Sequence, residues 1–286
     1  MANKFLIVGD LHGHKPKIHY EGYDAIIAPG DFCSDESKKY NFEALRIRMK
    51  DTKSRTQWYD VVGRDKAKEI VDLSIKNGRK ILEFLNSLGK PVFIVPGNWD
   101  WTVDKNSDWD YLKQDHFKRL IDGLKNIVNV YHKRVEFEGY EIIGHGISSG
   151  PEFPQYKEDK ERLKPEELDE IKKDYERDSS KVSTLFEEAT KPVIFLSHNV
   201  PFNTPIDEIT NKESPRCGYH YGSLIAREMI DKYHPLVCIG GHMHEHFTKC
   251  MVGDTTAINA GFGSEVNVLL ELDDGKIEKL EFHQGQ

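Results

Sequence analysis

Seven residues with metal-binding side chains are spaced along the chain, and four of them form two close pairs. Asp10 and His12 are separated by one residue, and His242 and His244 repeat this spacing, so each pair can grip one ion from an extended turn. The full set is Asp10, His12, Asp31, Asn98, His198, His242 and His244. Carboxylate, amide and imidazole groups without a thiolate suit Mn²⁺, Fe, Zn²⁺ or Mg²⁺ and are unlike a closed structural zinc site. Seven ligands exceed what one tetrahedral ion uses and suffice for two ions that share a carboxylate.

A short apolar, β-branched run precedes each of these ligand positions. In chain order the runs are FLIV, AIIAP, VFIVP, VIFL and LVCI. Runs this short and this apolar predict strands that are buried on both faces. Helical patterns over 65–89 and 223–233 follow some of the strands, which predicts an α/β fold. Because sites in open α/β sheets form beyond the carboxyl ends of the strands, the seven ligands should meet there.

The last third of the chain has a different pattern, with strand-like segments joined by short turns. The segments are HFTKCMV, TTAINA, VNVLLEL and KIEKLEF, and the turns include VGDT and DDGK. Residues 133–144 have the pattern of one more hairpin. Together these segments predict a second, partly antiparallel sheet packed against the first.

Two polar segments, at about 35–64 and 157–191, look like additions to this scaffold. The first is weakly periodic and contains the basic stretch RMKDTKSR, whereas the second is rich in Lys, Glu and Asp and predicts exposed helix. The basic stretch is interpreted first as a solvated face. A lid that reads the substrate is the alternative, because this insertion leaves the sheet on the metal side. We interpret residues 1–286 as one domain that carries both insertions.

Taken in order, DLH, GD, GNWD, SHN and GHMH resemble the five motif blocks of the calcineurin-like metallophosphoesterase family. INAGF, after the last block, resembles the family's asparagine-glycine turn. Any single block is weak evidence, whereas five in order, each at a strand end, are specific. The resemblance covers Asp10 to about Gly263 and implies a four-layer α/β/β/α sandwich of two mixed sheets.

The resemblance also implies how two ions are held and what they do. One ion would be held by Asp10, His12, Asp31 and His244, and the other by Asp31, Asn98, His198 and His242, with Asp31 bridging. The catalytic residues would be Asp31, Asn98 and His198. Two divalent ions that share a carboxylate would bind the phosphoryl oxygens and lower the pKa of a bridging water, so that hydroxide attacks in line.

One position departs from the family pattern. Where the third block usually reads GNHD, this chain has GNWD, so Trp99 replaces a histidine often regarded as the proton donor to the leaving oxygen. Indole has no proton to transfer near neutral pH, and loss of a general acid typically costs about 10²–10⁴ in rate. Family members that lack this histidine are often associated with phosphodiesters, so the resemblance favours a diester or nucleotide-like substrate.

The remaining candidates concern the leaving group and the substrate. His145 and His220 lie in glycine-containing turns and are surrogates for the missing acid, with a hydrogen-bonded turn residue as the alternative role. Trp99 and Arg55 are candidates for the substrate pocket. For Trp99 the alternative is a wall residue that packs on the core.

Composition narrows the classes of function. The formal charge of -8, from 48 acidic and 40 basic residues, argues against a nucleic-acid partner. Four scattered cysteines and a start without a secretory apolar segment fit a reducing cytoplasm. No apolar run approaches the ~20 residues of a membrane-spanning helix, so no membrane partner is expected.

The sequence therefore predicts a metal-dependent phosphoric ester hydrolase that uses two divalent ions, Mn²⁺ being favoured, on a small phosphoester. A phosphomonoesterase or protein phosphatase is the alternative within this class. The alternative from another class is a metal-bound interaction scaffold with weak catalysis. The presence of all seven ligands favours the enzyme.

Overall fold

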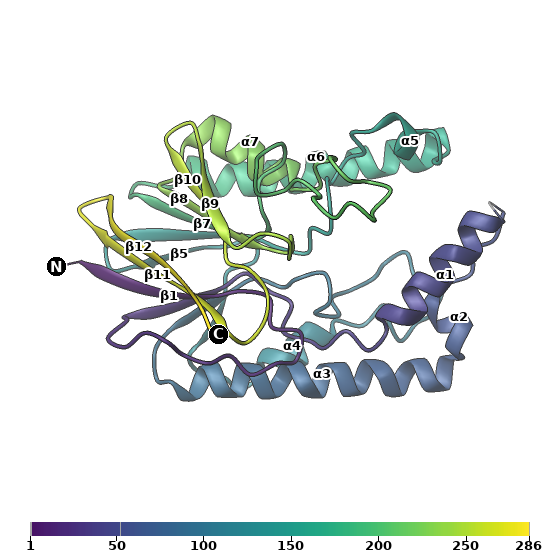
Figure 1. The fold of residues 1–286 in the computed structure, drawn as a ribbon, viewed down its shortest axis with the longest axis horizontal. Coiled ribbons are helices and arrows are strands. Elements are labelled where there is room, and N and C mark those ends of the chain that lie inside the picture. Colours follow the sequence, from purple (N-terminus) through teal and green to yellow (C-terminus); the bar gives the residue numbers. More distant parts are fainter. Residues whose placement is uncertain (1, 52, 286) are drawn as a thin grey trace.

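The computed structural model describes residues 2–51 and 53–285. Met1 and Gln286, at the ends of the predicted domain, and Thr52, in the basic stretch, lie outside the described residues. The described chain forms two six-stranded sheets that are stacked face to face, with α3 against one sheet and α6 and α7 against the other (Figure 1). This arrangement confirms the predicted α/β fold with four layers and two mixed sheets.

The first sheet has the strand order β12-β11-β1-β2-β3-β4. Its strands are β1 (Asn3–Val8), β2 (Ala25–Ala28), β3 (Val92–Ile94), β4 (Ile127–Asn129), β11 (Val266–Asp273) and β12 (Lys276–Gln284). Strands β1 to β4 are parallel, and β11 runs antiparallel to β1. The carboxyl ends of β1, β2 and β3 therefore lie along one edge.

The second sheet has the order β5-β6-β7-β8-β10-β9. Its strands are β5 (Arg134–Phe137), β6 (Tyr140–His145), β7 (Val193–Asn199), β8 (Val237–Gly241), β9 (Thr248–Val252) and β10 (Thr255–Asn259). The predicted hairpin at 133–144 is the β5–β6 pair. The C-terminal segments do not all join this sheet as expected, because β11 and β12 pair with β1 instead.

Seven helices are present among the described residues. They are α1 (Lys38–Lys50), α2 (Trp58–Val62), α3 (Arg64–Ser87), α4 (His116–Ile121), α5 (Lys157–Lys160), α6 (Pro165–Glu187) and α7 (Leu224–Tyr233). The long α3 and α7 occupy the two predicted helical segments. Ser223 starts α7 by accepting a hydrogen bond from the Ala226 N–H, which satisfies a donor that has no partner within the helix. The segments at 35–64 and 157–191 contain α1–α2 and α5–α6.

Three apolar cores hold the layers together, and strand alternation decides which side chain enters which core. On β1, Leu6 and Val8 pack toward α3, whereas Phe5 and Ile7 pack between the two sheets. The third core lies between the second sheet and α6 and α7. Within the described ranges, no helix has the length and apolar character needed to cross a membrane.

Candidate metal centre

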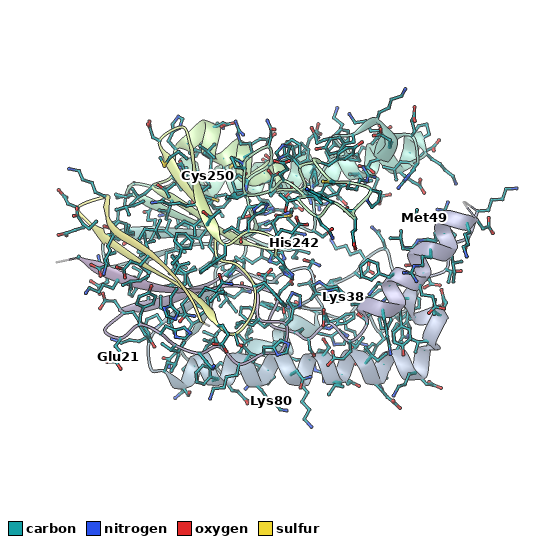
Figure 2. The ribbon with its side chains drawn as sticks, viewed as in Figure 1. Glu21, Lys38, Met49, Lys80, His242 and Cys250 are labelled. Atoms are coloured by element: carbon teal, nitrogen blue, oxygen red, sulfur yellow. The ribbon has the colours of Figure 1, made fainter. Side chains whose placement is uncertain are left out.

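All seven candidate ligands lie at or just beyond the carboxyl end of a parallel strand. Two follow β1, one follows β2 and one follows β3, in the first sheet. The other three come from the ends of β7 and β8, in the second sheet. In Figure 2 the labelled His242 lies centrally, where the ends of the two sheets face each other. The predicted meeting of the ligands at the strand ends is what the structure shows.

The ligand atoms form two groups that meet at Asp31. Asp10, His12 and His244 form one group, Asp31, His198 and His242 the other, and within each group the potential ligand atoms lie within 4.8 Å of one another. The distance between His12 Nε2 and Asp31 Oδ2 is 3.4 Å, so the second group is in contact with the first. His198 Nε2 lies 3.6 Å from the same Asp31 oxygen. Asp31 therefore occupies the position that a bridging carboxylate requires.

The second group and Asn98 bring potential ligand atoms close together. His198 Nδ1 lies 2.9 Å from the carbonyl oxygen of Pro29, which can only accept, so this nitrogen carries the ring hydrogen. His198 Nε2 then presents a lone pair, yet it lies 2.9 Å from Asn98 Oδ1. His242 Nδ1 also lies 2.9 Å from that oxygen. Acceptors that converge in this way suit a cation, and the Pro29 carbonyl orients the imidazole toward it.

Buried polar atoms without a hydrogen-bond partner, in the first group and on Asp31, also indicate a cation site. Asp10 Oδ1, both ring nitrogens of His12 and Asp31 Oδ2 are buried and make no hydrogen bond. A buried polar atom without a partner costs free energy, which metal coordination would recover. The residues present thus fit two hard or borderline divalent ions.

Burial sets the electrostatics of the centre. It raises the pKa of the Asp31 carboxyl well above its ordinary value, and the neighbouring charge of Asp10 raises this pKa further. Burial lowers the pKa of His12 to about 4 and that of His242 to about 3. These two imidazoles are therefore neutral near pH 7, which is the form that coordinates a metal.

The backbone at the centre adopts conformations that are uncommon for residues with side chains. His12, Asp31 and His242 have φ angles of 43°, 55° and 63°, in the left-handed region. Such strain gathers at functional sites, where the surrounding structure imposes it. Gly241 is required by close packing, since a Cβ there would lie 2.2 Å from Asp10 Oδ1.

Asp100 has a role that the sequence alone did not indicate. Its buried carboxylate accepts hydrogen bonds from the backbone N–H groups of Asp31, Phe32, Cys33 and Gly97, at 2.8–2.9 Å. It therefore ties the turn that carries Asp31 to the turn before Asn98. Its partners lie on a turn 67–69 residues away, so a local sequence motif does not reveal them.

Two aromatic side chains border the first group of ligands. Trp99 meets the His12 ring edge to face at 6.0 Å, and its backbone N–H donates to Asp31 Oδ1. Phe262, which is 43% exposed, stacks on the His244 ring at 4.3 Å. Trp99 is thus a partly exposed wall of the centre. Phe262 lies in the INAGF turn, whose asparagine and glycine were the only sequence signal for it.

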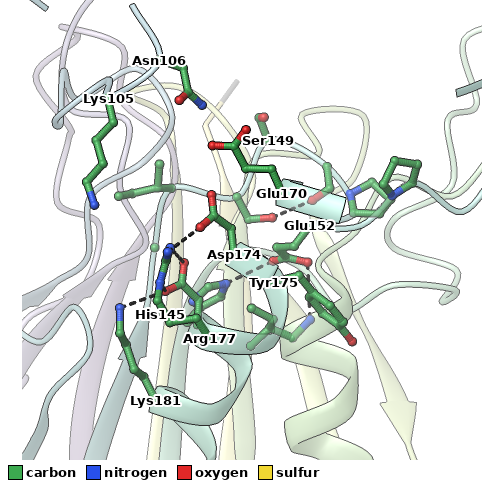
Figure 3. Close-up of a pocket in the computed structure, with 18 of the residues that line it drawn as sticks. Lys105, Asn106, His145, Ser149, Glu152, Glu170, Asp174, Tyr175, Arg177 and Lys181 are labelled. Atoms are coloured by element: carbon green, nitrogen blue, oxygen red, sulfur yellow. Dashed lines mark hydrogen bonds and ion pairs between the residues drawn. The ribbon is translucent and has the colours of Figure 1, made fainter. Parts of the chain in front are cut away.

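His145 points away from the metal centre. It is level with Ser197 on β7 and follows Ile143 by two residues, so it lies on the face covered by α6 and α7. His198 lies on the opposite face, toward the first sheet. His145 Nε2 is paired with Glu152 at 3.1 Å, beside a cavity of about 1000 Å³ that none of the seven ligands lines (Figure 3). Strand alternation turns His145 from the metal centre, so its position does not support the expectation that it replaces the missing acid.

His220 has a different environment. Its Nδ1 lies 2.7 Å from Asp207 Oδ1, and Asp207 is fully buried, with its carboxylate accepting from the Thr204 and Gly222 N–H groups. The imidazole is thus oriented by a fixed carboxylate while 26% of the side chain stays exposed.

The loop that carries His220 is attached to two ligand-bearing segments. Asn199, next in sequence to a ligand, donates its amide to the Tyr221 carbonyl at 2.8 Å. Glu245, also next to a ligand, accepts from the Thr210 backbone N–H at 2.5 Å. The loop is therefore attached to the two segments that carry His198 and His244.

Arg55 lies on the first insertion and is mostly exposed. Its nearest charged partner is Glu167 on α6, at 3.8 Å, so the pair joins the two insertions. Within the described part of the chain, no ion pair joins Arg55 to a candidate metal ligand. Its place in the substrate pocket stays a prediction.

Comparison with known proteins agrees with this geometry. The model of a family described as calcineurin-like phosphoesterase matches residues 3–246. Among curated proteins, no sequence matches this chain. One crystal structure aligns over 100% of both chains at 16% identity with a TM-score of 0.66. That of the protein TT1561 of Thermus thermophilus aligns over 99% of both chains, at 16% identity and a TM-score of 0.55. At such identity these two structures show the fold alone.

Proposed function

The chain belongs to the calcineurin-like phosphoesterase family, and on this premise we propose that it hydrolyses phosphodiesters or nucleotide-like phosphoesters with two divalent metal ions. The observation that carries the proposal is the convergence of buried acceptor atoms around Asp31. A scaffold that binds no metal would have no reason to keep these buried lone pairs unpaired.

Each ligand has a role in the proposal. Asp10, His12 and His244 would hold one ion, Asn98, His198 and His242 would hold the other, and Asp31 would contribute to both. When bound, the ions supply positive charge for the phosphoryl oxygens and activate water as the nucleophile. We favour Mn²⁺, since the ligands mix oxygen and imidazole nitrogen without a thiolate. The protein's own contribution is to fix this geometry through Pro29 and Asp100.

The proton for the leaving oxygen is assigned, in this proposal, to His220. Trp99 cannot supply it, because an indole N–H is not acidic near neutral pH. His220 is oriented by a buried carboxylate, is partly exposed, and lies on a loop attached to two segments that carry ligands, which supports its assignment as general acid. His145 has no such claim, since it lies on the other face of the sheet.

Hydrolysis of an aryl phosphodiester with added Mn²⁺ tests the proposal. Asp31→Asn is expected to remove activity, whereas Asp254→Asn, at an exposed turn position, should retain it. The substrate panel should also contain aryl and alkyl monoesters. Tight metal binding without hydrolysis of any mono- or diester would favour a metal-bound scaffold and end the enzyme interpretation.

A leaving-group comparison tests the part assigned to His220. His220→Asn should lower kcat about 10²-fold on an alkyl ester and much less on a nitrophenyl ester, whose leaving group needs no proton. A Trp99→His variant should gain little on alkyl monoesters if His220 already serves. A gain of about 10²-fold or more would show that the acid is missing from the native site.

A further inference from the structure

Helix α1 is the most basic element of an acidic protein. Residues 38–55 contain seven basic side chains and two acidic ones, in a chain whose formal charge is -8. Among residues 2–51 and 53–285, no carboxylate lies within ion-pair distance of Arg46, Lys50 or Lys53. Their charges are therefore free to act on something outside the chain.

The same helix exposes apolar side chains along one face. Phe42, Leu45 and Met49 are 53%, 42% and 64% exposed. Their spacing of i, i+3 and i+7 places them on one stripe of the helix. The opposite face is the one that packs, through the buried Ala44. Soluble proteins seldom display such a stripe without a partner that covers it.

The helix is also placed where a partner can reach it. Figure 1 shows α1 standing out from the body at the end of the molecule toward which β1 runs, on the side of the metal centre. In Figure 2, Lys38 and Met49 mark the base and the outer end of the helix. The segment is attached to the body of the protein through α2, where Trp58 packs against Trp101. Helix α1 itself therefore contributes little to the apolar core.

We propose that α1, together with Lys53 shortly after its end, is a docking surface for an anionic lipid membrane, with Phe42, Leu45 and Met49 entering the interface and Arg46, Lys50 and Lys53 contacting anionic headgroups. A helix that joins exposed apolar residues to free cations has the chemistry of a membrane-surface element. The free cations of α1 favour an anionic bilayer. The rest of the chain is acidic and is repelled by such a bilayer, so α1 is the part of the surface that would face it. The sequence predicted no membrane partner, because no apolar run could span a bilayer, and the proposal departs from that expectation, since a surface-bound helix needs no such run.

Docking also has a consequence for the metal centre, and this consequence rests on the proposed function. A helix anchored beside the centre would hold it close to phosphoesters at the bilayer surface. Lipid-linked phosphodiesters would then be hydrolysed faster in vesicles than as dispersed molecules. The docking itself does not depend on hydrolysis, so the two can fail separately.

Vesicle sedimentation with the full chain tests the docking. Wild-type protein should sediment with vesicles of phosphatidylcholine and phosphatidylserine, less so as salt is raised, and not with phosphatidylcholine alone. Arg46→Gln, Lys50→Gln and Lys53→Gln combined should weaken binding about a hundredfold, since each cation near an anionic surface contributes about fivefold. Phe42→Ser, Leu45→Ser and Met49→Ser combined should weaken it at least about tenfold.

Matched variants separate docking from general surface effects. Leu73→Ser with Met251→Ser removes exposed apolar groups from α3 and β9, and Lys76→Gln with Lys80→Gln and Lys90→Gln removes cations elsewhere. Both sets should bind vesicles like the wild type, and circular dichroism should show that every variant is folded. No binding to anionic vesicles, or equal loss in the matched sets, would overturn the proposal. In the first case a protein partner becomes the candidate for α1.

Discussion

Asp31 is the residue that both ligand groups contact. Because it is buried, its carboxylate should lower the stability of the folded protein without metal and raise it with metal. In the metal-free protein the raised pKa of Asp31 means that burial without a nearby cation disfavours the ionised carboxylate. A raised carboxyl pKa contributes stability that is lost as pH rises through the folded pKa, so the ionised form opposes folding at neutral pH.

The Asp31→Asn variant should therefore be more stable than the wild type in chelator, by about 1–3 kcal/mol at neutral pH. With Mn²⁺ present the order should reverse, because only the wild type gains the stability of metal binding. Urea unfolding in both conditions measures the two differences. The same sign in chelator and in Mn²⁺ would contradict the assignment.

His12 should respond to acid in the metal-free protein. Burial lowers its folded pKa to about 4 from an ordinary value of 6.5. Between these values the unfolded chain binds the proton and the folded protein does not, so its stability is present above pH 6.5 and is lost as pH falls toward 4.

The measurement compares the wild type with His12→Asn in chelator. The stability of the wild type relative to the variant should fall by up to about 1.4 kcal/mol per pH unit between pH 6.5 and 4. The comparison cancels groups that titrate in both proteins. A stability difference that does not change with pH would show that His12 binds its proton equally well in the folded and the unfolded protein.

At the scale of the element, the turns that follow the strands position the ligands more directly than the strands do. Asp100 accepts four backbone N–H groups and holds the turns of Asp31 and Gly97 together. Asp100→Ala should lower the free energy of unfolding by about 3 kcal/mol or more, because buried donors lose their acceptor. Metal affinity should fall with it. Asp104→Ala, at an exposed turn with similar bonds, should cost much less, and equal losses would refute the special role.

The elements also show how far the sequence predicts structure. The strand ends, α3, α7 and the β5–β6 hairpin follow from local periodicity and turn chemistry, and they appear as predicted. The sheet that β11 and β12 join was not predicted, since pairing with β1 is a contact between distant segments. Helix α1 was interpreted only as a polar insertion, because its apolar residues face outward and give no core-facing period.

At the scale of the whole molecule, the metal centre joins the two sheets. Asp10 and Asp31 come from the first sheet, and His198 and His242 come from the second. The ordered motifs predicted this ligand set, but not which side chains flank it. His145 and His220 have similar sequence surroundings, and only the three-dimensional pleat and loop contacts separate them. Metal bound across both sheets should also stabilise the entire fold, by about 2.7 kcal/mol at a hundredfold excess over Kd.

The most direct test of the account is a titration of metal-free protein with Mn²⁺, in which bound metal and hydrolysis of an aryl phosphodiester are measured in the same samples. The account predicts no hydrolysis in chelator, two tightly bound ions per chain as the two ligand groups imply, and full activity only when both are bound. Hydrolysis that persists in the fully chelated protein, or two bound ions with no phosphoester cleaved, would contradict it.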